Sequence, residues 1–327
     1  MLVLTAAEVA RALSMQEAIS VCEQAYAVFS AGEALAPVRT QIPVAPYNGT
    51  SVFMPASLPT AGATAVKVVS VYPANPAHGL PTIMGAVLLL DATSGRPLAL
   101  MEGSYLTALR TGAAAAAAAR YLARPEARVA ALFGCGVQGR TQVQGLAAIR
   151  PLTEVWVYDP VAERTASFVQ EMAPTLPSVT FQVADSPVQA VQKAEVVTTA
   201  TTSARPVFSG EWLQPGTHVS AIGAFTPQMQ EIDEVTIDRA SKVVVDSREA
   251  VLAEAGDIII PWRQGKLRER DLIEVGELVR GKCPGRESDT EITVYKAVGI
   301  SVLDVATAAA VYARACDLGL GTTVRLG

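Results

Sequence analysis

The sequence predicts an α/β protein with two domains: a doubly wound parallel sheet and a second, α+β domain. From about residue 128, short β-rich runs alternate with helical stretches, which is typical of βαβ units. Before about residue 110, turns rich in Pro and Gly separate the apolar runs instead. The chain has 327 residues, of which 50% are hydrophobic and 17% charged, so it is long and apolar enough for two compact domains.

The N-terminal part is expected to contain helices at its two ends and strands between them. Residues 1–20 predict an amphipathic helix, because Glu8, Arg11 and Glu17 interrupt an apolar run. The run "TALRTGAAAAAAARYLA" predicts a close-packed connecting helix, since alanine is the strongest helix former. Strands are expected in "VFMPASL", "AVKVVSVYP" and "TIMGAVLLL", with a hairpin loop at "DATSG".

The alternating part predicts strands in "VAALFG", "EVWVYD", "VTFQVAD", "EVVTTAT", "THVSAIG" and "KVVVDS", and helices over 137–149, 161–172 and "SPVQAVQKA". The segment "EITVYKAVGISVLDVATAAAVYARACDLGLG" predicts one more strand and a helix that ends near two glycines. We expect this last helix to return to the first domain.

Composition limits the partners and the chemistry. A net charge of −5 offers no basic field for nucleic acid or an anionic membrane surface. The four cysteines are far apart and form no C-x-x-C pair, which fits a reducing cytoplasm. We expect neither a signal peptide nor a membrane span. The two histidines, His78 and His218, are too few to suggest a catalytic triad or a metal site, and each is expected to be a hydrogen-bonded or surface residue.

A glycine-rich turn predicts a dinucleotide site. In "FGCGVQG", Gly134 permits a tight turn, Gly136 the close approach of a pyrophosphate, and Gly139 the packing of a helix on the sheet. The N-terminus of that helix presents free N–H groups to the anion. Asp159 ends the next strand, where an acid binds the adenosine ribose hydroxyls. Asp159 would repel a 2′-phosphate and favours NAD(H), although the nearby Arg164 leaves NADP(H) open.

Three cations upstream predict an anion site. Lys67 lies between valines, and taken alone it is more easily read as a lysine whose stem covers an apolar face. Arg110 is expected at the N-terminus of the alanine-rich helix, where a cation is disfavoured unless an anion lies near it. Arg39 and Arg110 are also suited to bidentate carboxylate binding.

Taken together, "VSVYPANPAHGLPT", "LDATSGRPLALMEGSYLTALRTGAAAAAAARYLA", "GCGVQG" and "PGRESDTEITVYKAVGISVLDVA" resemble the ornithine cyclodeaminase and mu-crystallin family over nearly the whole chain. The resemblance implies a substrate-binding and dimerisation domain over 1–115, joined by a return over 305–327, and a Rossmann dinucleotide-binding domain over 116–304. It implies a homodimer and gives carboxylate binding and proton transfer to Arg39, Lys67 and Arg110. The positions that it places near the cofactor, besides the three glycines, are Thr82, Thr111, Val137, Gln138, Asp159, Thr201 and Ser301.

One departure bears on the substrate. Cyclodeaminases of this family carry an Asp in the loop after the strand "VSAIG", where this chain has Phe225. An aromatic ring cannot accept an amine proton, so the chain looks like the reductases that use NAD(P)H to convert Δ1-pyrroline-2-carboxylate to L-proline and Δ1-piperideine-2-carboxylate to L-pipecolate. Alternatively, Phe225 only packs the loop and Glu231 or Asp233 supplies the acid.

The open alternatives are an ornithine cyclodeaminase, an alanine dehydrogenase, a crystallin-like ligand-binding protein, and a redox sensor using Cys135. For a reductase, Lys67 either binds the substrate carboxylate or gives a proton to the imine nitrogen. In the second case burial and the two arginines should bring its pKa towards neutrality, because both disfavour the ammonium form.

Overall fold

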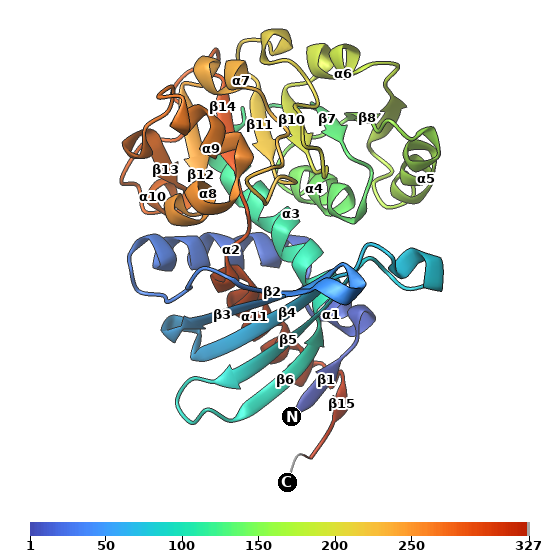
Figure 1. Ribbon diagram of the computed structural model, residues 1–327, viewed down its shortest axis with the longest axis vertical. Helices are drawn as coiled ribbons and strands as arrows, with labels where there is room; N and C mark the ends of the chain where they lie inside the picture. The colour runs from blue at the N-terminus through green and yellow to red at the C-terminus, as the bar shows by residue number, and fades with distance from the viewer. Residues whose placement is uncertain (326–327) are drawn as a thin grey trace. The chain divides into compact units, whose positions relative to one another are not determined.

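The computed structural model describes residues 1–325 and divides into two units. One unit is Met1–Arg110 together with the segment from Ile300 onward, and the other is Thr111–Gly299. The boundary expected after residue 115 lies in the same helix as the first of these divisions, α3 (Gly103–Leu122), and the one expected before residue 305 lies in α11 (Ser301–Asp317). Figure 1 labels most of the helices and strands of each unit.

The first unit is built on a seven-stranded sheet of order β15-β1-β6-β5-β4-β3-β2. Its strands are β1 (Leu2–Leu4), β2 (Thr40–Val44), β3 (Gly49–Leu58), β4 (Ala63–Val71), β5 (Ile83–Asp91), β6 (Pro97–Glu102) and β15 (Thr322–Thr323). Its other helices are α1 (Ala6–Ala12) and α2 (Met15–Ser30), with 3₁₀ turns at Ala45–Tyr47, Pro59–Ala61 and Asn75–His78. All pairings are antiparallel except that of β1 with β6, and α11 packs on β3, β4 and α2. The last helix therefore packs within the first unit.

The single helix expected over residues 1–20 is wrong. Residues 2–4 form β1, and two separate helices follow, each of which begins with a capping box. Thr5 pairs with Glu8 in the first box, and Ser14 pairs with Glu17 in the second. In each box the hydroxyl and the carboxylate satisfy each other's backbone N–H groups, so the second box starts a new helix where the amphipathic pattern alone suggests continuity.

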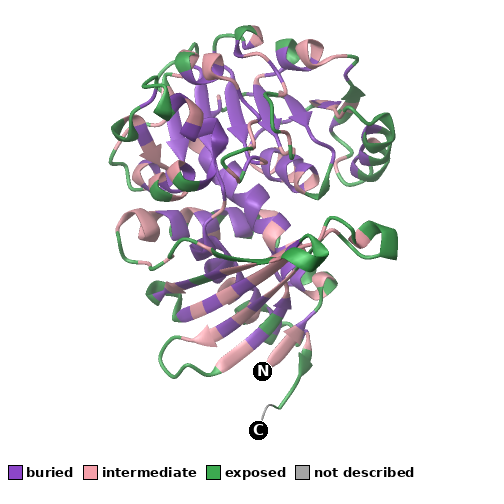
Figure 2. Cartoon of the chain, viewed as in Figure 1, coloured by how far each residue is buried: buried purple, intermediate pink, exposed green. Residues whose placement is uncertain are grey.

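Burial alternates along the strands of this sheet, as the alternating colours in Figure 2 show. In β4 the side chains of Ala63, Ala65 and Lys67 are buried, while the intervening ones are only partly covered. Because successive side chains of a strand point to opposite faces, Lys67 shares the face of the two alanines. That is the face on which α11 packs, and the strand therefore directs a lysine into the core.

The second unit is an eight-stranded parallel sheet of order β13-β12-β14-β11-β10-β7-β8-β9. Its strands are β7 (Val129–Phe133), β8 (Glu154–Tyr158), β9 (Thr180–Val183), β10 (Val196–Thr199), β11 (His218–Ala221), β12 (Lys242–Val245), β13 (Leu272–Glu274) and β14 (Thr293–Lys296). Its helices are α4 (Val137–Ala147), α5 (Ala162–Met172), α6 (Pro187–Lys193), α7 (Glu234–Arg239), α8 (Arg248–Glu254), α9 (Gly256–Arg263) and α10 (Val275–Val279), with 3₁₀ turns at Gly210–Trp212 and Glu269–Asp271.

The order of these strands places a topological switch between β7 and β10. From β7 the chain proceeds to β8 and β9 on one side, and then to β10 and β11 on the other, where β14, β12 and β13 complete the sheet. Two apolar clusters of buried residues pack around the sheet. The predicted doubly wound, Rossmann-type sheet is confirmed, and its carboxyl edge at the switch is where such folds bind nucleotides.

The alanine-rich helix is close-packed, as predicted. The seven alanines at 113–119 are buried, and a Cβ on Gly112 would lie 2.3 Å from the Thr141 carbonyl oxygen in α4. A Cβ on Gly145 would likewise lie 2.5 Å from the Gly112 carbonyl oxygen. Small residues therefore let the backbones of α3 and α4 approach closely.

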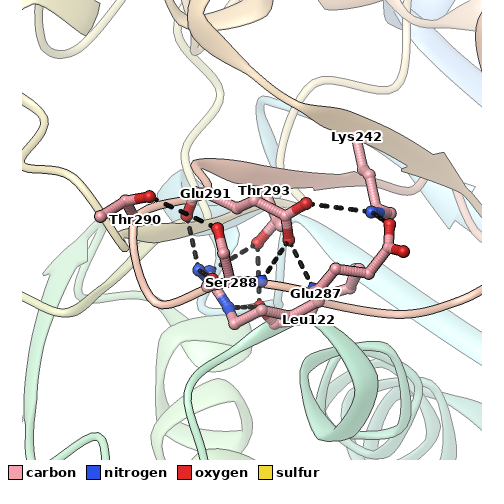
Figure 3. Close-up of polar contacts among 8 residues, drawn as sticks. Leu122, Lys242, Glu287, Ser288, Thr290, Glu291 and Thr293 are labelled. Atoms are coloured by element: carbon pink, nitrogen blue, oxygen red, sulfur yellow. Dashed lines mark hydrogen bonds and ion pairs between the residues drawn. The ribbon is translucent and has the colours of Figure 1, made fainter.

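The motif "PGRESDTE" has a structural role, shown in Figure 3. Lys242 at the start of β12 bridges two of its carboxylates, with Nζ 2.6 Å from Glu287 and 3.1 Å from Glu291. The Thr293 hydroxyl donates to the Leu122 carbonyl at the end of α3, 3.0 Å away, and contacts Nδ1 of the buried His218 at 3.0 Å. These contacts fasten the segment before β14 to α3.

His218 is thus a hydrogen-bonded core residue, and His78 lies exposed in a 3₁₀ turn, as expected for both. All four cysteines are free thiols. Within residues 1–325, none of the helices combines the length and apolar character that crossing a bilayer requires.

Candidate active site

The turn between β7 and α4 has the geometry of a pyrophosphate site. Gly134 has φ +97°, and a Cβ there would lie 2.6 Å from the Ala200 carbonyl oxygen, so only glycine fits. A Cβ on Gly139 would lie 2.4 Å from the Gly134 carbonyl oxygen, which explains the third glycine. A Cβ on Gly136 would meet no described atom within 4 Å, so this glycine faces open space.

The start of α4 suits an anion. The helix begins at Val137, and its capping residue Gly136 has no side chain that could accept the first N–H groups. Val137 is 66% exposed, and Gln138 follows it in the first turn. Backbone donors and the helix dipole together make this end ready to bind a phosphate. The residues therefore fit a dinucleotide.

Asp159 lies beside the glycine turn at the end of β8. Its Oδ2 accepts the Cys135 N–H at 3.2 Å and its Oδ1 accepts the Val161 N–H at 3.0 Å. Arg164, whose side chain is 66% exposed, lies 3.9 Å from Oδ1. This places a carboxylate where the ribose of an adenosine bound at the turn requires an acceptor.

Cys135 is not poised for redox chemistry. Burial, and then the charge of Asp159, raise the pKa of its thiol to about 12. The reactive form of a cysteine is the thiolate, which is scarce at neutral pH for such a group. The redox-sensor alternative therefore loses its basis.

The remaining positions expected near the cofactor are divided between the units. Thr111 is a buried residue of α3, and Thr201 follows β10, both in the second unit. Thr82 lies before β5 and its carbonyl accepts the Tyr72 N–H, while Ser301 begins α11 and donates to the Pro55 carbonyl at 2.9 Å; both belong to the first unit. The approach of Thr82 and Ser301 to a bound dinucleotide stays a prediction.

In the first unit a buried carboxylate joins two of the predicted cations. Asp304, in the first turn of α11, has Oδ2 2.8 Å from Lys67 Nζ and Oδ1 2.9 Å from Arg110 Nε. All three residues are buried. Asp304 is not among the residues predicted from the sequence, although its position in "SVLDVA", within a helix of small apolar residues, was a signal that the acid is buried.

The expected position of Arg110 at a helix N-terminus is wrong. α3 begins at Gly103, where the Glu102 carboxylate accepts the N–H groups of Ser104 and Tyr105 at 2.8 Å each. Arg110 lies inside the helix, and the anion that compensates it is Asp304. The prediction failed because Glu102 caps the helix and allows it to start earlier than the alanine run suggests.

The electrostatics of this cluster favour a proton-transfer role for Lys67. Burial lowers the pKa of Lys67 to about 7, with Arg110 and Arg39 acting in the same direction and Asp304 against it. Burial alone would raise the pKa of Asp304, but Arg110 and Lys67 hold it below its ordinary value. Asp304 is therefore a carboxylate, and Lys67 exchanges its proton near neutral pH, as expected from the sequence. Two cations contact this single carboxylate and Arg39 adds its charge to the field at Lys67, so the cluster has an excess of positive charge for an anionic ligand.

The two alternative acids of the loop after β11 are already engaged. Glu231 is fully buried and accepts hydrogen bonds from Thr201, Gly223 and Ala224. The Asp233 carboxylate caps α7 by accepting the Thr236 N–H at 2.8 Å. Phe225 itself is 38% exposed. The hypothesis that one of these acids replaces the missing Asp therefore has no support.

A Rossmann-type sheet with a glycine turn, together with buried cations around a carboxylate, defines a dinucleotide-dependent enzyme. More specifically, the chain belongs to the ornithine cyclodeaminase/mu-crystallin family, whose model matches residues 1–318. The resemblance noted in the sequence is thereby confirmed.

Relatives match over almost the full chain. The chain is 38% identical over 325 residues to a Delta(1)-pyrroline-2-carboxylate reductase of Bacillus cereus, covering 99% of each chain. The structure of the Thermococcus litoralis Delta(1)-pyrroline-2-carboxylate reductase in complex with NADH and L-proline is similar, with a TM-score of 0.94, 40% identity, and coverage of 99% of this chain and 100% of that one. An archaeal alanine dehydrogenase dimer with bound NAD has a TM-score of 0.92 at 35% identity, and covers 100% of this chain and 99% of that one.

Proposed function

We propose that this chain is an NAD(H)-dependent reductase of cyclic ketimines, which converts Δ1-pyrroline-2-carboxylate to L-proline and Δ1-piperideine-2-carboxylate to L-pipecolate. The observation that carries the proposal is the buried Lys67, whose pKa of about 7 suits a proton donor at neutral pH. The full-length similarity to two pyrroline-2-carboxylate reductases supports the substrate class.

In this mechanism the residues of the first unit bind the imino acid and protonate it. Arg39 and Arg110 bind the substrate carboxylate. Because Nε of Arg110 pairs with Asp304, the terminal guanidinium nitrogens of Arg110 are the ones that bind the substrate. The Lys67 ammonium donates its proton to the imine nitrogen, and Asp304 orients both cations. NADH, when bound, would supply the hydride for the imine carbon, and together with the proton from Lys67 this would convert the C=N bond into a CH–NH bond.

The second unit binds the dinucleotide through Gly134, Gly136 and Gly139, and through Asp159. We expect a preference for NADH over NADPH, because the Asp159 carboxylate would repel a 2′-phosphate. Some use of NADPH is compatible with the exposed Arg164 beside it.

The first unit also serves dimerisation in this proposal. Its sheet carries a cross-strand row of apolar side chains on the face opposite to Lys67, formed by Pro55, Val66, Leu88 and Leu100, and each is only half-buried or exposed. Such a row suits a second copy of the chain, and the archaeal alanine dehydrogenase is a dimer. We expect a cytoplasmic homodimer that acts in proline metabolism, and light scattering in solution would test its mass.

One panel of substrates tests the proposed activity. Nicotinamide absorbance should change fastest with Δ1-pyrroline-2-carboxylate or Δ1-piperideine-2-carboxylate. Ammonia-dependent NADH oxidation with pyruvate would instead indicate an alanine dehydrogenase, and ammonia release from ornithine with catalytic NAD a cyclodeaminase. Binding of NADH without turnover of any of these would indicate a ligand-binding protein, and each of these three results would refute the ketimine reductase.

A further inference from the structure

A buried carboxylate joins two loops at the carboxyl edge of the parallel sheet. Glu231 Oε1 accepts the Thr201 N–H at 2.6 Å and the Thr201 hydroxyl at 2.8 Å. Its Oε2 accepts the N–H groups of Gly223 at 2.5 Å and Ala224 at 3.0 Å. Thr201 follows β10, and Gly223 and Ala224 follow β11, so one side chain sets the spacing of two loops.

A second layer holds Glu231 from behind. Asp257, at the start of α9, accepts the N–H groups of Glu231 at 2.6 Å and Ile232 at 3.1 Å through Oδ1. Its Oδ2 lies 2.8 Å from Nζ of Lys296, the last residue of β14. Glu231, Asp257 and Lys296 are all buried, and the low dielectric of the interior strengthens the interactions among them.

The two loops pack tightly around this carboxylate. A Cβ on Gly223 would lie 2.1 Å from the Thr201 carbonyl oxygen and 2.6 Å from Glu231 Oε1. Glycine is therefore required at 223, and a small displacement of Glu231 must move both loops.

The network lies under the half of the edge that the adenosine does not use. Asp159 marks the adenosine side at β8, and the glycine turn after β7 receives the pyrophosphate. A dinucleotide that crosses the switch point continues over the ends of β10 and β11. The loops that flank its nicotinamide half are then residues 200–203 and 222–226, which Glu231 ties together.

We propose that Glu231, backed by Asp257 and Lys296, is a positioning residue that shapes the binding site of the nicotinamide half of the dinucleotide. The inference rests on the NAD(H) dependence proposed above. In this proposal Glu231 is not a catalytic group; its carboxylate holds the backbone of the two loops in place.

Glu231→Gln tests this with little change of shape. Its amide places an N–H donor against backbone N–H groups, so one loop loses its acceptor. Glu195→Gln is the matched control, because Glu195 also accepts two backbone N–H groups, those of Arg128 and Val129, where β7 begins at the opposite edge of the sheet. Calorimetric titration of each variant uses NADH and ADP, since ADP contains only the adenosine and the two phosphates.

We expect Glu231→Gln to bind NADH about 10-fold or more weakly, with ADP affinity within about 2-fold of the wild type. Glu195→Gln should bind both ligands as the wild type does, whatever its melting temperature. An equal loss of ADP and NADH affinity by Glu231→Gln, or an unchanged NADH affinity, would overturn the inference. Wild-type protein that binds neither ligand would instead refute the proposed cofactor.

If Glu231→Gln does not fold, Glu231→Asp provides the second test. It keeps the charge but is one methylene shorter, so it cannot hold both loops at the present spacing. Selective loss of NADH affinity by Glu231→Asp supports the inference, and wild-type affinity for NADH refutes it.

Discussion

Replacing Lys67 with arginine separates proton donation from carboxylate binding. The guanidinium keeps the positive charge beside Asp304 and can still pair with a carboxylate, but it does not release a proton at any accessible pH. If Lys67 protonates the imine nitrogen, Lys67→Arg should lower kcat by about 10²-fold or more. If Lys67 only binds the carboxylate, the variant should change mainly KM.

The burial of Lys67 also makes the stability of the protein depend on pH. Burial, then Arg110 and Arg39, lower its pKa from the ordinary 10.5 to about 7. That difference corresponds to about 5 kcal/mol in favour of the neutral amine. Between these two values the unfolded chain holds a proton on this lysine that the folded chain does not hold. The stability contributed by this lysine is thus present above pH 10.5 and is lost as the pH falls to about 7, by at most about 1.4 kcal/mol per pH unit.

The rate of reduction should depend on pH in the opposite direction to stability, because reduction requires the ammonium form of Lys67. In the wild type, kcat/KM for NADH-dependent reduction should fall as the pH rises through about 7. The oxidation of L-proline with NAD⁺ requires the neutral amine as a base and should rise over the same range. Measuring both directions between about pH 5.5 and 9.5 separates this pattern from a general loss of activity.

Lys67→Arg should show neither of these two pH dependences. Titration of the imine substrate itself is common to both proteins and cancels in the ratio of their rates. Wild-type kcat in Lys67→Arg, or a transition near pH 7 that persists in the variant, would show that Lys67 is not the proton donor.

Three further predictions follow from the described contacts. Asp304→Asn removes the carboxylate between two cations, so the pH at which the reduction rate falls should decrease by about one unit or more, and the free energy of unfolding should decrease by about 3 kcal/mol. Rate–pH profiles and urea unfolding measure these two changes, and an unchanged rate–pH profile would contradict the role given to Asp304. Asp159→Ser should raise the ratio of NADPH to NADH use by about 10-fold or more in steady-state assays, and an unchanged ratio would exclude Asp159 as the selective residue. Burial, then Arg286 and Arg150, lower the pKa of His218 to about 3, so the free energy of unfolding should decrease as the pH falls below about 6.5. In urea unfolding, His218→Gln should lose about 2 kcal/mol less than the wild type between about pH 6.5 and 5, and equal losses in the two proteins would contradict this.

The parts of the fold and site that sequence predicts are those that local pattern encodes. A glycine that needs a positive φ, such as Gly134, and an acid at the end of the next strand, such as Asp159, are fixed by neighbours within one βαβ unit. The burial of Lys67 was not predicted, because the valines around it favoured a lysine stem on an apolar face, whereas the side chain shares the buried face of Ala63 and Ala65. The separate starts of α1 and α2 were encoded as well, in Thr5 with Glu8 and Ser14 with Glu17, although the amphipathic pattern concealed them.

The roles of the two buried acids could not be predicted in the same way. Asp304 pairs with residues of β4 and α3, and Glu231 binds backbone that follows β10 as well as β11. Whether an acid is catalytic, structural or solvated depends on the groups that it contacts. These groups lie far from it in the sequence, so no local pattern indicates them. Arg110 shows the same limit, since only the fold reveals that the anion beside it is Asp304 rather than substrate.

The charge balance of the first unit suggests how the proton donor is loaded. Lys67 and Arg110 both contact the Asp304 carboxylate, and the positive charges of Arg110 and Arg39 help to keep the pKa of Lys67 near 7. A substrate carboxylate that enters the cluster adds a negative charge, and an added negative charge favours the ammonium form of a lysine. In the proposed reductase, binding of the imino acid should therefore raise the pKa of Lys67 and draw a proton onto it when the imine nitrogen needs one. Release of the product should reverse this change, so a larger fraction of Lys67 is charged while substrate occupies the site.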